Sequence, residues 1–508
     1  MKRVRAVAKL SDAPGGCLVA SNASRQPSTA VYRHSTLNSP TKLPSQTSSQ
    51  FKPVIKLLIP TRHASASAIP TYLQKTPLYD MHVANGATMV PFGGYLMPVQ
   101  YKSFGVGVSH HFTRSHASLF DVSHMVQHLI SGPGANAFLE SITPAGIKTL
   151  ADRTSTLSAL LWPYTGGIVD DTIVTRLGPE TFYVVTNAGC REKDLEYLTG
   201  QKAEFEKNGG EKVEWKVLNG AGLVALQGPL SAQILEELIA WPEENQDIKK
   251  LMEGVMIKKL YFGSCQFIKI KLLDGSISDD VLVSRGGYTG EDGFEISIPA
   301  HNAVAVTEAL LRNAGPERLQ LAGLGARDSL RLEAGMCLYG HDLNDATTPV
   351  EAGLSWIIGK DRRTEGGFHG SDVVLGQLES VSKGGVGVKE RRVGFIVEGA
   401  PAREGSVIVD PDGEPIGRIT SGCPSPTLKK NIAMGYINTG FHKAGTDVEV
   451  VVRGKKRKAK VTKMPFVPSK YFKPTKGVDS SVYSNTELAA ITAYEQRQEE
   501  NYLKNVTI

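Results

Sequence analysis

Two adjacent acidic residues, Asp170 and Asp171, lie within the apolar segment GGIVDDTIV, which runs from Gly166 to Val174. Their neighbours are mostly β-branched, which predicts a half-buried strand. Side chains alternate across a strand, so we expect the two carboxylates to point to opposite faces, one solvated and one turned inward. A partly desolvated carboxylate can accept a proton and stabilise positive charge that develops on a substrate. Alternatively both acids merely end a hairpin, because Gly-Gly before a strand is ordinary turn chemistry.

Other motifs that could carry chemistry are weaker. The glycine-rich stretches FGVGVSH and RGGYTGEDG match neither a dinucleotide fingerprint nor a phosphate loop, so no flavin or nicotinamide domain is predicted. His124 and His128 have metal-ligand spacing for a helix. A strand is predicted there, however, and it would separate them by about 13 Å. We therefore expect no metal site, only core or surface histidines. The basic run Lys455–Lys458 is predicted at a hairpin turn, either as a solvated edge or as a docking site for an acidic partner.

Length and charge limit the function classes. The chain has 508 residues, enough for two to four domains, and no apolar run long enough to predict membrane insertion. Its net charge is +6, yet the residues before Asp80 contain eleven Lys or Arg and one acid, so the remainder carries about −4. The positive charge belongs mainly to the N-terminal segment and does not indicate nucleic-acid binding. Five scattered cysteines without CxxC spacing fit a reducing compartment.

The N-terminal segment, residues 1–70, is rich in Ser, Thr, Ala and basic residues and nearly free of acids. This composition is typical of a mitochondrial or plastid transit peptide. The alternative is a disordered basic tail. If the segment is a transit peptide, we expect cleavage between Ser35 and Thr71.

The remaining chain divides by its hydrophobic patterns. Residues 76–360 alternate helical and strand patterns without a strict βαβ rhythm, which predicts an α+β domain. Residues 361–390 are rich in Gly, Ser and Lys and are predicted to connect two domains. Residues 391–474 contain six short strand patterns, which predict a small antiparallel β-barrel or jelly roll. The tail, residues 475–508, is polar and predicted to be loosely attached and partly helical.

Nine segments form a characteristic set in a fixed order. They are FDVSHM (120–125), GGIVDDTIV (166–174), YVVTNAGC (183–190), GYTGEDGFEIS (287–297), LAGLGARDSLRLEAGMCLYG (321–340), TTPVEAGLSW (347–356), RRVGF (391–395), TSGCPSPTLKKNIAMGY (420–436) and MPFVP (464–468). Together they closely resemble the aminomethyltransferase, or T-protein, family of the glycine cleavage system. The resemblance runs from about Thr76 to Lys473 and leaves out the N-terminal segment and the tail.

The resemblance implies a folate enzyme with a ferredoxin-like subdomain and a C-terminal antiparallel β-barrel. Such an enzyme accepts the aminomethyl group on the lipoyl arm of H-protein and transfers its carbon to tetrahydrofolate. The products are 5,10-methylene-tetrahydrofolate, ammonia and the reduced arm. The implied partners are H-protein and, functionally, the P- and L-proteins, and the implied compartment is the mitochondrial matrix. No metal, flavin or nicotinamide is implied.

The resemblance also assigns residues. Asp171 corresponds to the catalytic carboxylate beside the folate nitrogens, and Asp170 is expected to be structural. Glu295 corresponds to an acid that binds the amine and ring N–H of the pterin as a forked pair. Further folate-contacting positions are Met125, Asn187, Arg327, Trp356 and Tyr471.

Some of these assignments have alternatives. Arg327 is expected to bind the anionic tail of the ligand, but a helix-surface ion pair with Asp328 is also possible. Met125 and Trp356 could pack in the core rather than line a pocket. Thr172 stands where the family usually has an aliphatic residue, which predicts a slightly more polar site.

Other protein families that contain this folate-binding module have different functions. Sarcosine and dimethylglycine dehydrogenases attach it to a flavin domain, for which this sequence has no counterpart. A non-catalytic relative linked to iron–sulfur assembly carries a cysteine in a KGCYxGQE-like motif, where this chain has Gly287. A scaffold role within the glycine cleavage complex would require Asp171 to be dispensable.

Overall fold

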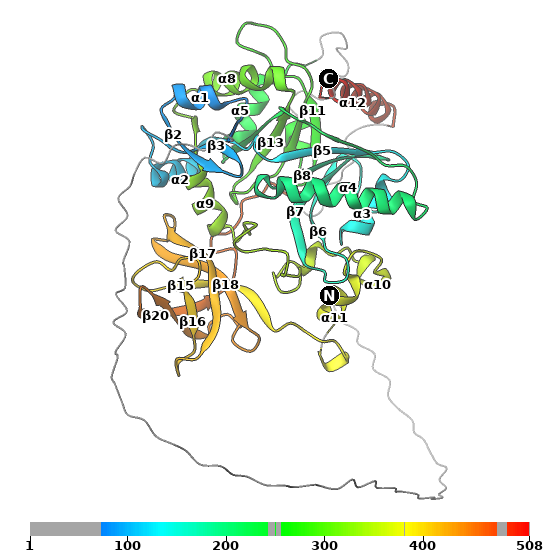
Figure 1. Cartoon of the computed structure of the whole chain (residues 1–508). Helices are drawn as coiled ribbons and strands as arrows, with labels where there is room; N and C mark the ends of the chain where they lie inside the picture. The colour runs from blue at the N-terminus through cyan, green and yellow to red at the C-terminus, as the bar shows by residue number, and fades with distance from the viewer. Residues whose placement is uncertain (1–72, 242–248, 250–255, 380, 475–484, 507–508) are drawn as a thin grey trace, which may run out of the picture. The chain divides into compact units, whose positions relative to one another are not determined.

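The computed structural model describes residues 73–241, 249, 256–379, 381–474 and 485–506, all within one compact unit. The predicted transit peptide lies outside these residues. The expected fold class is confirmed, because an α+β body is followed by a closed antiparallel barrel (Figure 1).

The body contains a six-stranded sheet in the order β11-β12-β13-β10-β4-β14. Its strands are β4 (Ala117–Asp121), β10 (Gly222–Gln227), β11 (Cys265–Ile268), β12 (Val281–Arg285), β13 (Gly293–Ile298) and β14 (Leu319–Leu321). Helices α5 (Ser231–Leu238) and α8 (Ala303–Ala314) pack their apolar residues on one face of this sheet. Helix α8 ends before Gly315, whose φ of +72° suits glycine. The short helix α7 (Met256–Lys259) contributes Ile257 to the same core.

A second, five-stranded sheet has the order β6-β7-β8-β5-β9. Its strands are β5 (Val126–Ser131), β6 (Thr154–Leu161), β7 (Ile168–Gly178), β8 (Thr181–Thr186) and β9 (Glu214–Val217). Helices α3 (Ala135–Ile142) and α4 (Arg191–Lys207) cover one face through Phe138 and Tyr197. A separate buried cluster joins residues of both sheets, including Phe120, Tyr183 and Leu223. One of the candidate site residues, Met125, packs against this shared cluster.

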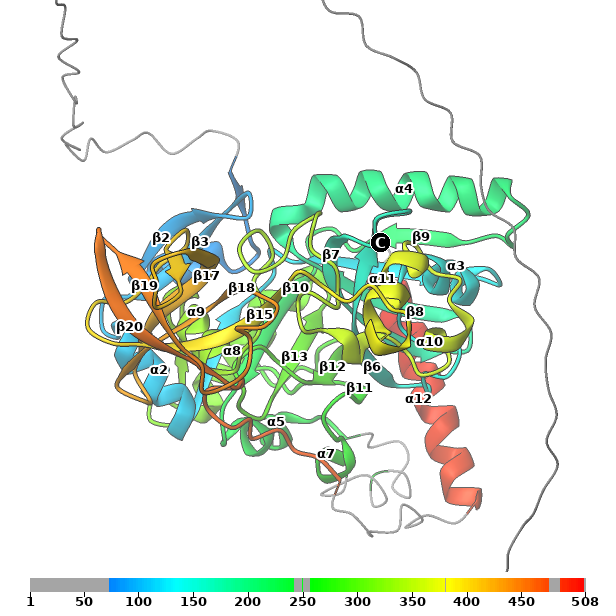
Figure 2. The ribbon, with the colours of Figure 1, turned by 90° about the horizontal axis from the view of Figure 1, so that it is seen from below.

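A small sheet with two nearby helices and one further helix complete the body. Strands β1 (Gln74–Lys75), β2 (Ala87–Phe92) and β3 (Tyr95–Tyr101) form a small sheet with helices α1 (Tyr79–Ala84) and α2 (Val106–Ser115) nearby. Helix α9 (Leu324–Glu333) packs against α2 and β3 on one side and against the barrel strand β17 on the other (Figures 1 and 2). It therefore connects the body to the barrel.

The predicted connection over residues 361–390 contains helices that the sequence analysis did not anticipate. Helices α10 (Arg362–Glu365) and α11 (Ser371–Leu378) lie here, and Phe368 and Val374 are buried in a cluster with Leu161 of β6. Apolar residues of this glycine-rich segment, among them Phe368, Val374 and Val388, pack on the body and give the segment a defined structure.

The C-terminal barrel closes in the order β15-β18-β17-β16-β19-β20. Its strands are β15 (Glu390–Val397), β16 (Val407–Val409), β17 (Pro415–Ser425), β18 (Lys430–Asn438), β19 (Asp447–Val452) and β20 (Lys455–Thr462). Alternating residues such as Phe395 and Val450 fill the interior. The basic run opens β20 directly after the turn at Arg453 and Gly454, as expected of a solvated hairpin edge.

The tail differs from the prediction. Helix α12 (Asn485–Asn505) is helical as expected, but it is not loosely attached. Tyr502 is fully buried in the cluster shared by the two sheets, and its hydroxyl lies 2.7 Å from Ser297 Oγ. An ion pair of 2.8 Å between Arg153 and Glu499 holds the same helix. None of the helices in the described ranges has the length and apolarity that a bilayer crossing requires.

Candidate functional site

The acid pair lies on β7 beside a β-bulge. Strand β6 pairs with β7 so that Leu160 faces Asp170 and Leu161 faces Ile168, which leaves Val169 as the extra residue. Bulges bend a strand and redirect its side chains, and they are frequent next to active sites. Asp170 is fully buried and Asp171 only partly so, in agreement with the expected difference in exposure.

Asn187 joins the two carboxylates. It follows β8, and its backbone N–H donates to Asp170 Oδ2 at 2.7 Å. Its side-chain amide donates to Asp170 Oδ1 and to Asp171 Oδ1, both at 2.9 Å. The two acids therefore meet at one amide instead of diverging as regular alternation predicts. The physical reason is that β8 pairs with β7 only from Ile173 onward, so the edge beside the acids is open to Asn187.

Among the described residues, no Lys or Arg forms an ion pair with Asp170 or Asp171 that would lower their pKa values. Burial and the negative charge of Asp170 together raise the pKa of Asp171 to about 7, and the hydrogen bond from Asn187 opposes both. Burial also raises the pKa of Asp170 despite its two hydrogen bonds from Asn187. A carboxylate that titrates near neutrality is suited to proton transfer at physiological pH.

Tyr288 belongs to this site, although the sequence analysis did not assign it a role. Its hydroxyl donates to the Cys337 carbonyl, and the Arg327 guanidinium lies 4.7 Å from the centre of its ring. Burial raises its pKa, and the charges of Asp171 and Arg327 act on it in opposite directions. The charges of both Asp171 and Arg327 therefore reach the Tyr288 hydroxyl. The only sequence signal for it was its place in the GYTGEDGFEIS segment.

Arg327 and Glu295 form a second polar group. Arg327 is on α9, and its neighbour Asp328 pairs with Arg331 at 2.8 Å, so the proposed surface ion pair between Arg327 and Asp328 is not what the structure shows. Arg327 Nη1 is buried and has no hydrogen-bond partner among the described residues. Burial raises the pKa of Glu295, on β13, and the Arg327 charge lowers it. A buried donor without a partner, close to a desolvated acid, fits a polar ligand.

The other predicted folate contacts, Met125, Trp356 and Tyr471, lie in different surroundings. Met125 packs against the cluster shared by the two sheets. Trp356 is 62% exposed on a short 3-10 helix (Ser355–Ile357), so it does not pack in the core. Tyr471 stacks on Phe262 with ring centres 4.1 Å apart. The contacts within the described ranges bring Asp170, Asp171 and Asn187 together and do not join Trp356 or Tyr471 to them.

Thr172 does not make the site more polar. Its hydroxyl donates to the Val185 carbonyl at 2.8 Å, and the residue is buried between the strands. This expectation was wrong because the neighbouring strand satisfies the hydroxyl.

Gly287 occupies a position that a side chain would not fit. Its φ is +153°, and an added Cβ would overlap the amide of Gln227. The cysteine of the iron–sulfur-assembly relatives would therefore require Gln227 to move.

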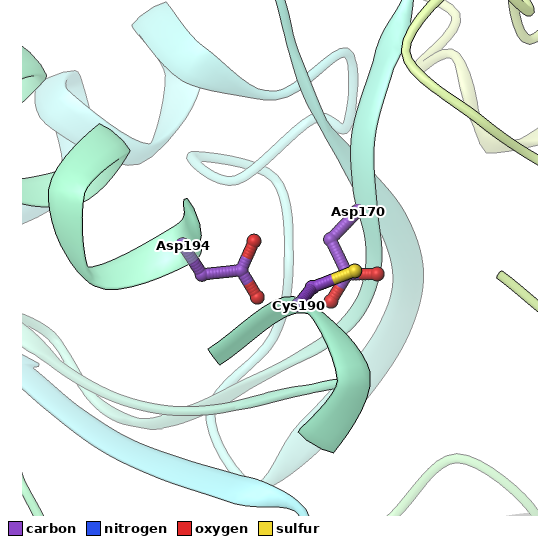
Figure 3. A group of neighbouring side chains, drawn as sticks. All are labelled: Asp170, Cys190 and Asp194. Atoms are coloured by element: carbon purple, nitrogen blue, oxygen red, sulfur yellow. The ribbon is translucent and has the colours of Figure 1, made fainter. Parts of the chain in front are cut away.

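The two histidines with metal-ligand spacing have different neighbours, whereas another group of side chains has metal-ligand geometry. His128 contacts Thr186 and Trp215, whereas His124 packs edge-on against Phe92 with ring centres 5.5 Å apart. The two are separate core histidines. Within the described residues, the one group with metal-ligand geometry is Asp170, Cys190 and Asp194, whose ligand atoms all lie within 4.8 Å of one another (Figure 3).

Comparisons with known proteins agree with this architecture. A model of the GCVT N-terminal domain matches residues 78–362, and one of the glycine cleavage T-protein C-terminal barrel domain matches residues 390–468. The chain is 48% identical over 412 residues to a probable mitochondrial aminomethyltransferase of Schizosaccharomyces pombe, covering 81% of this chain and 97% of the relative. It is 45% identical over 408 residues to the mitochondrial aminomethyltransferase of Mus musculus, covering 80% and 93%.

A solved structure is also similar. The glycine cleavage system aminomethyltransferase T from Bartonella henselae superposes with a TM-score of 0.66 at 36% identity, covering 79% of this chain and 100% of that one. The match to the C-terminal barrel model ends at residue 468, so helix α12 lies beyond both family models.

Proposed function

Because the chain belongs to the glycine cleavage T-protein family, we propose that it is an aminomethyltransferase. It takes the aminomethyl group from the lipoyl arm of H-protein and transfers the carbon to tetrahydrofolate. The products are 5,10-methylene-tetrahydrofolate, ammonia and the reduced dithiol arm. The observation that carries the residue assignment is the partly exposed Asp171 carboxylate, which a neutral amide holds and whose pKa is raised to about 7.

Asp171 is assigned two tasks in this reaction. The transferred carbon becomes electron-poor as ammonia leaves, and a fixed anion beside it stabilises that charge. When a folate nitrogen attacks the carbon, it must lose a proton, which a carboxylate of pKa about 7 can accept. Asn187 fixes the orientation of this carboxylate through its amide hydrogen bond. Asp170 anchors Asn187 and is not itself assigned a place at the reacting atoms.

The second polar group supports folate as the acceptor. A reduced pterin presents an amine and a ring N–H side by side, and the Glu295 carboxylate can accept both. The unpartnered Arg327 Nη1 can donate to a carbonyl or carboxylate of the ligand. Met125, which packs on the cluster shared by the two sheets, is proposed as an apolar surface for the ring. The residues present therefore fit a ligand with one polar edge and an apolar ring face. Trp356 and Tyr471 remain proposed contacts on the strength of the resemblance alone.

The proposed setting is the mitochondrial matrix, with the P- and L-proteins acting on the same lipoyl carrier. The composition of residues 1–70 supports import, and the relatives named above are described as mitochondrial. N-terminal sequencing of the native protein is expected to find cleavage between Ser35 and Thr71. An intact Met1 in the native protein would contradict import by cleavage.

The activity is tested with H-protein that carries the aminomethyl-lipoyl group, incubated with the full chain and tetrahydrofolate. We expect ammonia and 5,10-methylene-tetrahydrofolate in equal amounts, and a much slower release of ammonia when tetrahydrofolate is omitted. Release at the same rate without tetrahydrofolate would show that folate is not the acceptor. No release in either mixture would leave a scaffold role.

A further inference from the structure

A second buried acid lies behind the acid pair and has no part in the reaction proposed above. Asp194 is on the first turn of α4, is fully buried, and points toward Asp170 and the Cys190 thiol (Figure 3). Neither of its carboxyl oxygens has a hydrogen-bond partner among the described residues. An acid buried in this way without a donor must lower its charge or pay a large desolvation cost.

Among the described residues, no Lys or Arg forms an ion pair with Asp194. The Lys193 charge acts on Asp194, but its ammonium group donates to the Tyr339 hydroxyl at 2.6 Å and to Asp345 at 3.0 Å. Asp170, the other acid of the group, accepts two hydrogen bonds from Asn187, which stabilise its ionised form. Two neighbouring buried carboxyl groups cannot both ionise at low cost, so one of them keeps a proton. The hydrogen bonds from Asn187 select Asp194 as the protonated member.

We propose that Asp194 is a positioning residue whose protonated carboxyl donates to Asp170. Asp170 then orients Asn187, and Asn187 orients the Asp171 carboxylate. The chain of contacts runs from helix α4 through β7 to the reacting end of the site. This inference rests on the proposed function only in assigning Asp171 to the reaction. The shared proton itself does not depend on it.

The groups that act on Asp194 agree with a retained proton. Burial raises its pKa to about 10, and the charge of Asp170 acts in the same direction. The Thr186 hydroxyl and the Lys193 charge oppose this shift but are weaker. Burial also raises the pKa of the Cys190 thiol, which therefore stays neutral. The group thus carries one negative charge, on Asp170.

Two substitutions separate a proton donor from a charged structural acid. Asp194→Asn places an N–H₂ donor where the carboxyl proton is proposed, whereas Asp194→Ala removes the donor. Glu196→Gln is the control, because it removes an exposed acid from the same helix. We expect turnover in the coupled assay to stay within about threefold of wild type for Asp194→Asn. For Asp194→Ala we expect a fall of roughly 10- to 100-fold with KM for tetrahydrofolate little changed, as for a misaligned catalytic group.

A second readout does not require activity. The folded-state pKa of Asp194 lies above its unfolded value of about 4, so its contribution to stability is full below pH 4 and decreases as pH rises toward 10. Asparagine does not titrate, so the melting temperature of Asp194→Asn minus that of wild type should increase between pH 5 and pH 9. The same difference for Glu196→Gln should stay flat.

The results of these experiments distinguish the proposed role of Asp194 from its alternatives. If Asp194→Asn lowers the melting temperature equally at every pH, Asp194 is an ionised acid that favours the N-terminal turn of α4, and the proposal is overturned. A stoichiometric metal ion in the purified full chain, lost in Asp194→Asn, would also overturn it in favour of a metal site. A widening melting difference in a chain with no transferase activity would support the shared proton and reject the proposed function.

Discussion

Two carboxylates in this molecule, the partly exposed Asp171 and the fully buried Glu333, have opposite surroundings. Glu333, at the end of α9, accepts hydrogen bonds from Arg114 at 2.8 Å and from Thr427 Oγ1 at 2.8 Å, and lies 3.2 Å from His110 Nε2. Burial acts to raise its pKa, but the hydrogen bonds from His110, Ser425 and Arg114 outweigh burial and lower the pKa to about 2.

Asp171 is held by an amide and stands beside another acid. Its pKa is raised to about 7. The comparison shows that burial alone does not decide what a carboxylate does. The Arg114 cation and the neighbouring hydrogen-bond donors fix the charge of Glu333 and make it a structural link between α2, α9 and the barrel. Neutral and anionic neighbours leave Asp171 able to exchange a proton. The following predictions test this difference, beginning with the largest effect.

Replacement of Asp171 by asparagine should remove activity and keep the fold. We expect turnover in the coupled assay to fall by roughly 10²–10⁴-fold, the usual contribution of a positioned acid–base group, with tetrahydrofolate binding retained. Asp170→Asn should instead lower the free energy of unfolding, and its loss of turnover should be smaller than that of Asp171→Asn, because Asp170 anchors Asn187 by two hydrogen bonds and is not assigned a place at the reacting atoms. If the two variants lost turnover equally, the separate roles assigned to the two acids would be wrong.

Replacement of Glu333 by glutamine should have the reverse effect. Arg114 and His110 would lose a buried anion, and breaking such a pair costs roughly 3–5 kcal/mol of unfolding free energy. Denaturant unfolding measures the loss, and Glu404→Gln, at an exposed ion pair with His341, is the matched control. A loss below about 1 kcal/mol would mean that Glu333 does not hold the barrel to the body.

Replacement of Glu295 by alanine should weaken folate binding. Hydrogen bonds to a charged acceptor contribute roughly 1.5–3 kcal/mol, so the dissociation constant should rise about 10- to 100-fold. Isothermal titration calorimetry with tetrahydrofolate measures it, and Glu308→Ala on the exposed side of α8 is the control. Equal affinity in the wild type and Glu295→Ala would remove Glu295 from the pocket.

The last prediction concerns how turnover and stability depend on pH. Turnover should fall about tenfold per unit as pH drops below the Asp171 pKa of about 7, because the base becomes protonated. The two acids should also affect stability with opposite signs. Glu333 stabilises the fold above pH 4.5 and loses this effect as pH falls toward 2, whereas the contribution of Asp171 is present below pH 4 and lost as pH rises through 7. A turnover profile flat from pH 5 to 8 would contradict the role of Asp171.

Local sequence patterns predicted much of this fold. The β-branched run around the acid pair predicted β7, and the six short strand patterns after residue 390 predicted a barrel or jelly roll, which the structure shows to be a closed barrel. The structure of residues 361–390 was missed because a few apolar residues, among them Phe368, Val374 and Val388, anchor a polar, glycine-rich segment. The attachment of α12 was missed for a similar reason, since the fully buried Tyr502 belongs to an otherwise polar helix.

The candidate site was only partly predictable. The acid pair and Asn187 stand out by residue type, yet the bulge at Val169 and the open edge of β7 depend on tertiary pairing. Asp194 and Tyr288 were not assigned roles because an acid on a helix and a tyrosine in a loop are ordinary in sequence. Their importance comes from what the fold places beside them.

The most direct test of the account is a crystal structure of the protein with tetrahydrofolate bound. We expect the folate nitrogens that receive the carbon to lie beside the Asp171 carboxylate, with the amine edge of the pterin at Glu295. A well-ordered ligand at a site remote from Asp171 would contradict the assignment of this carboxylate to the reaction.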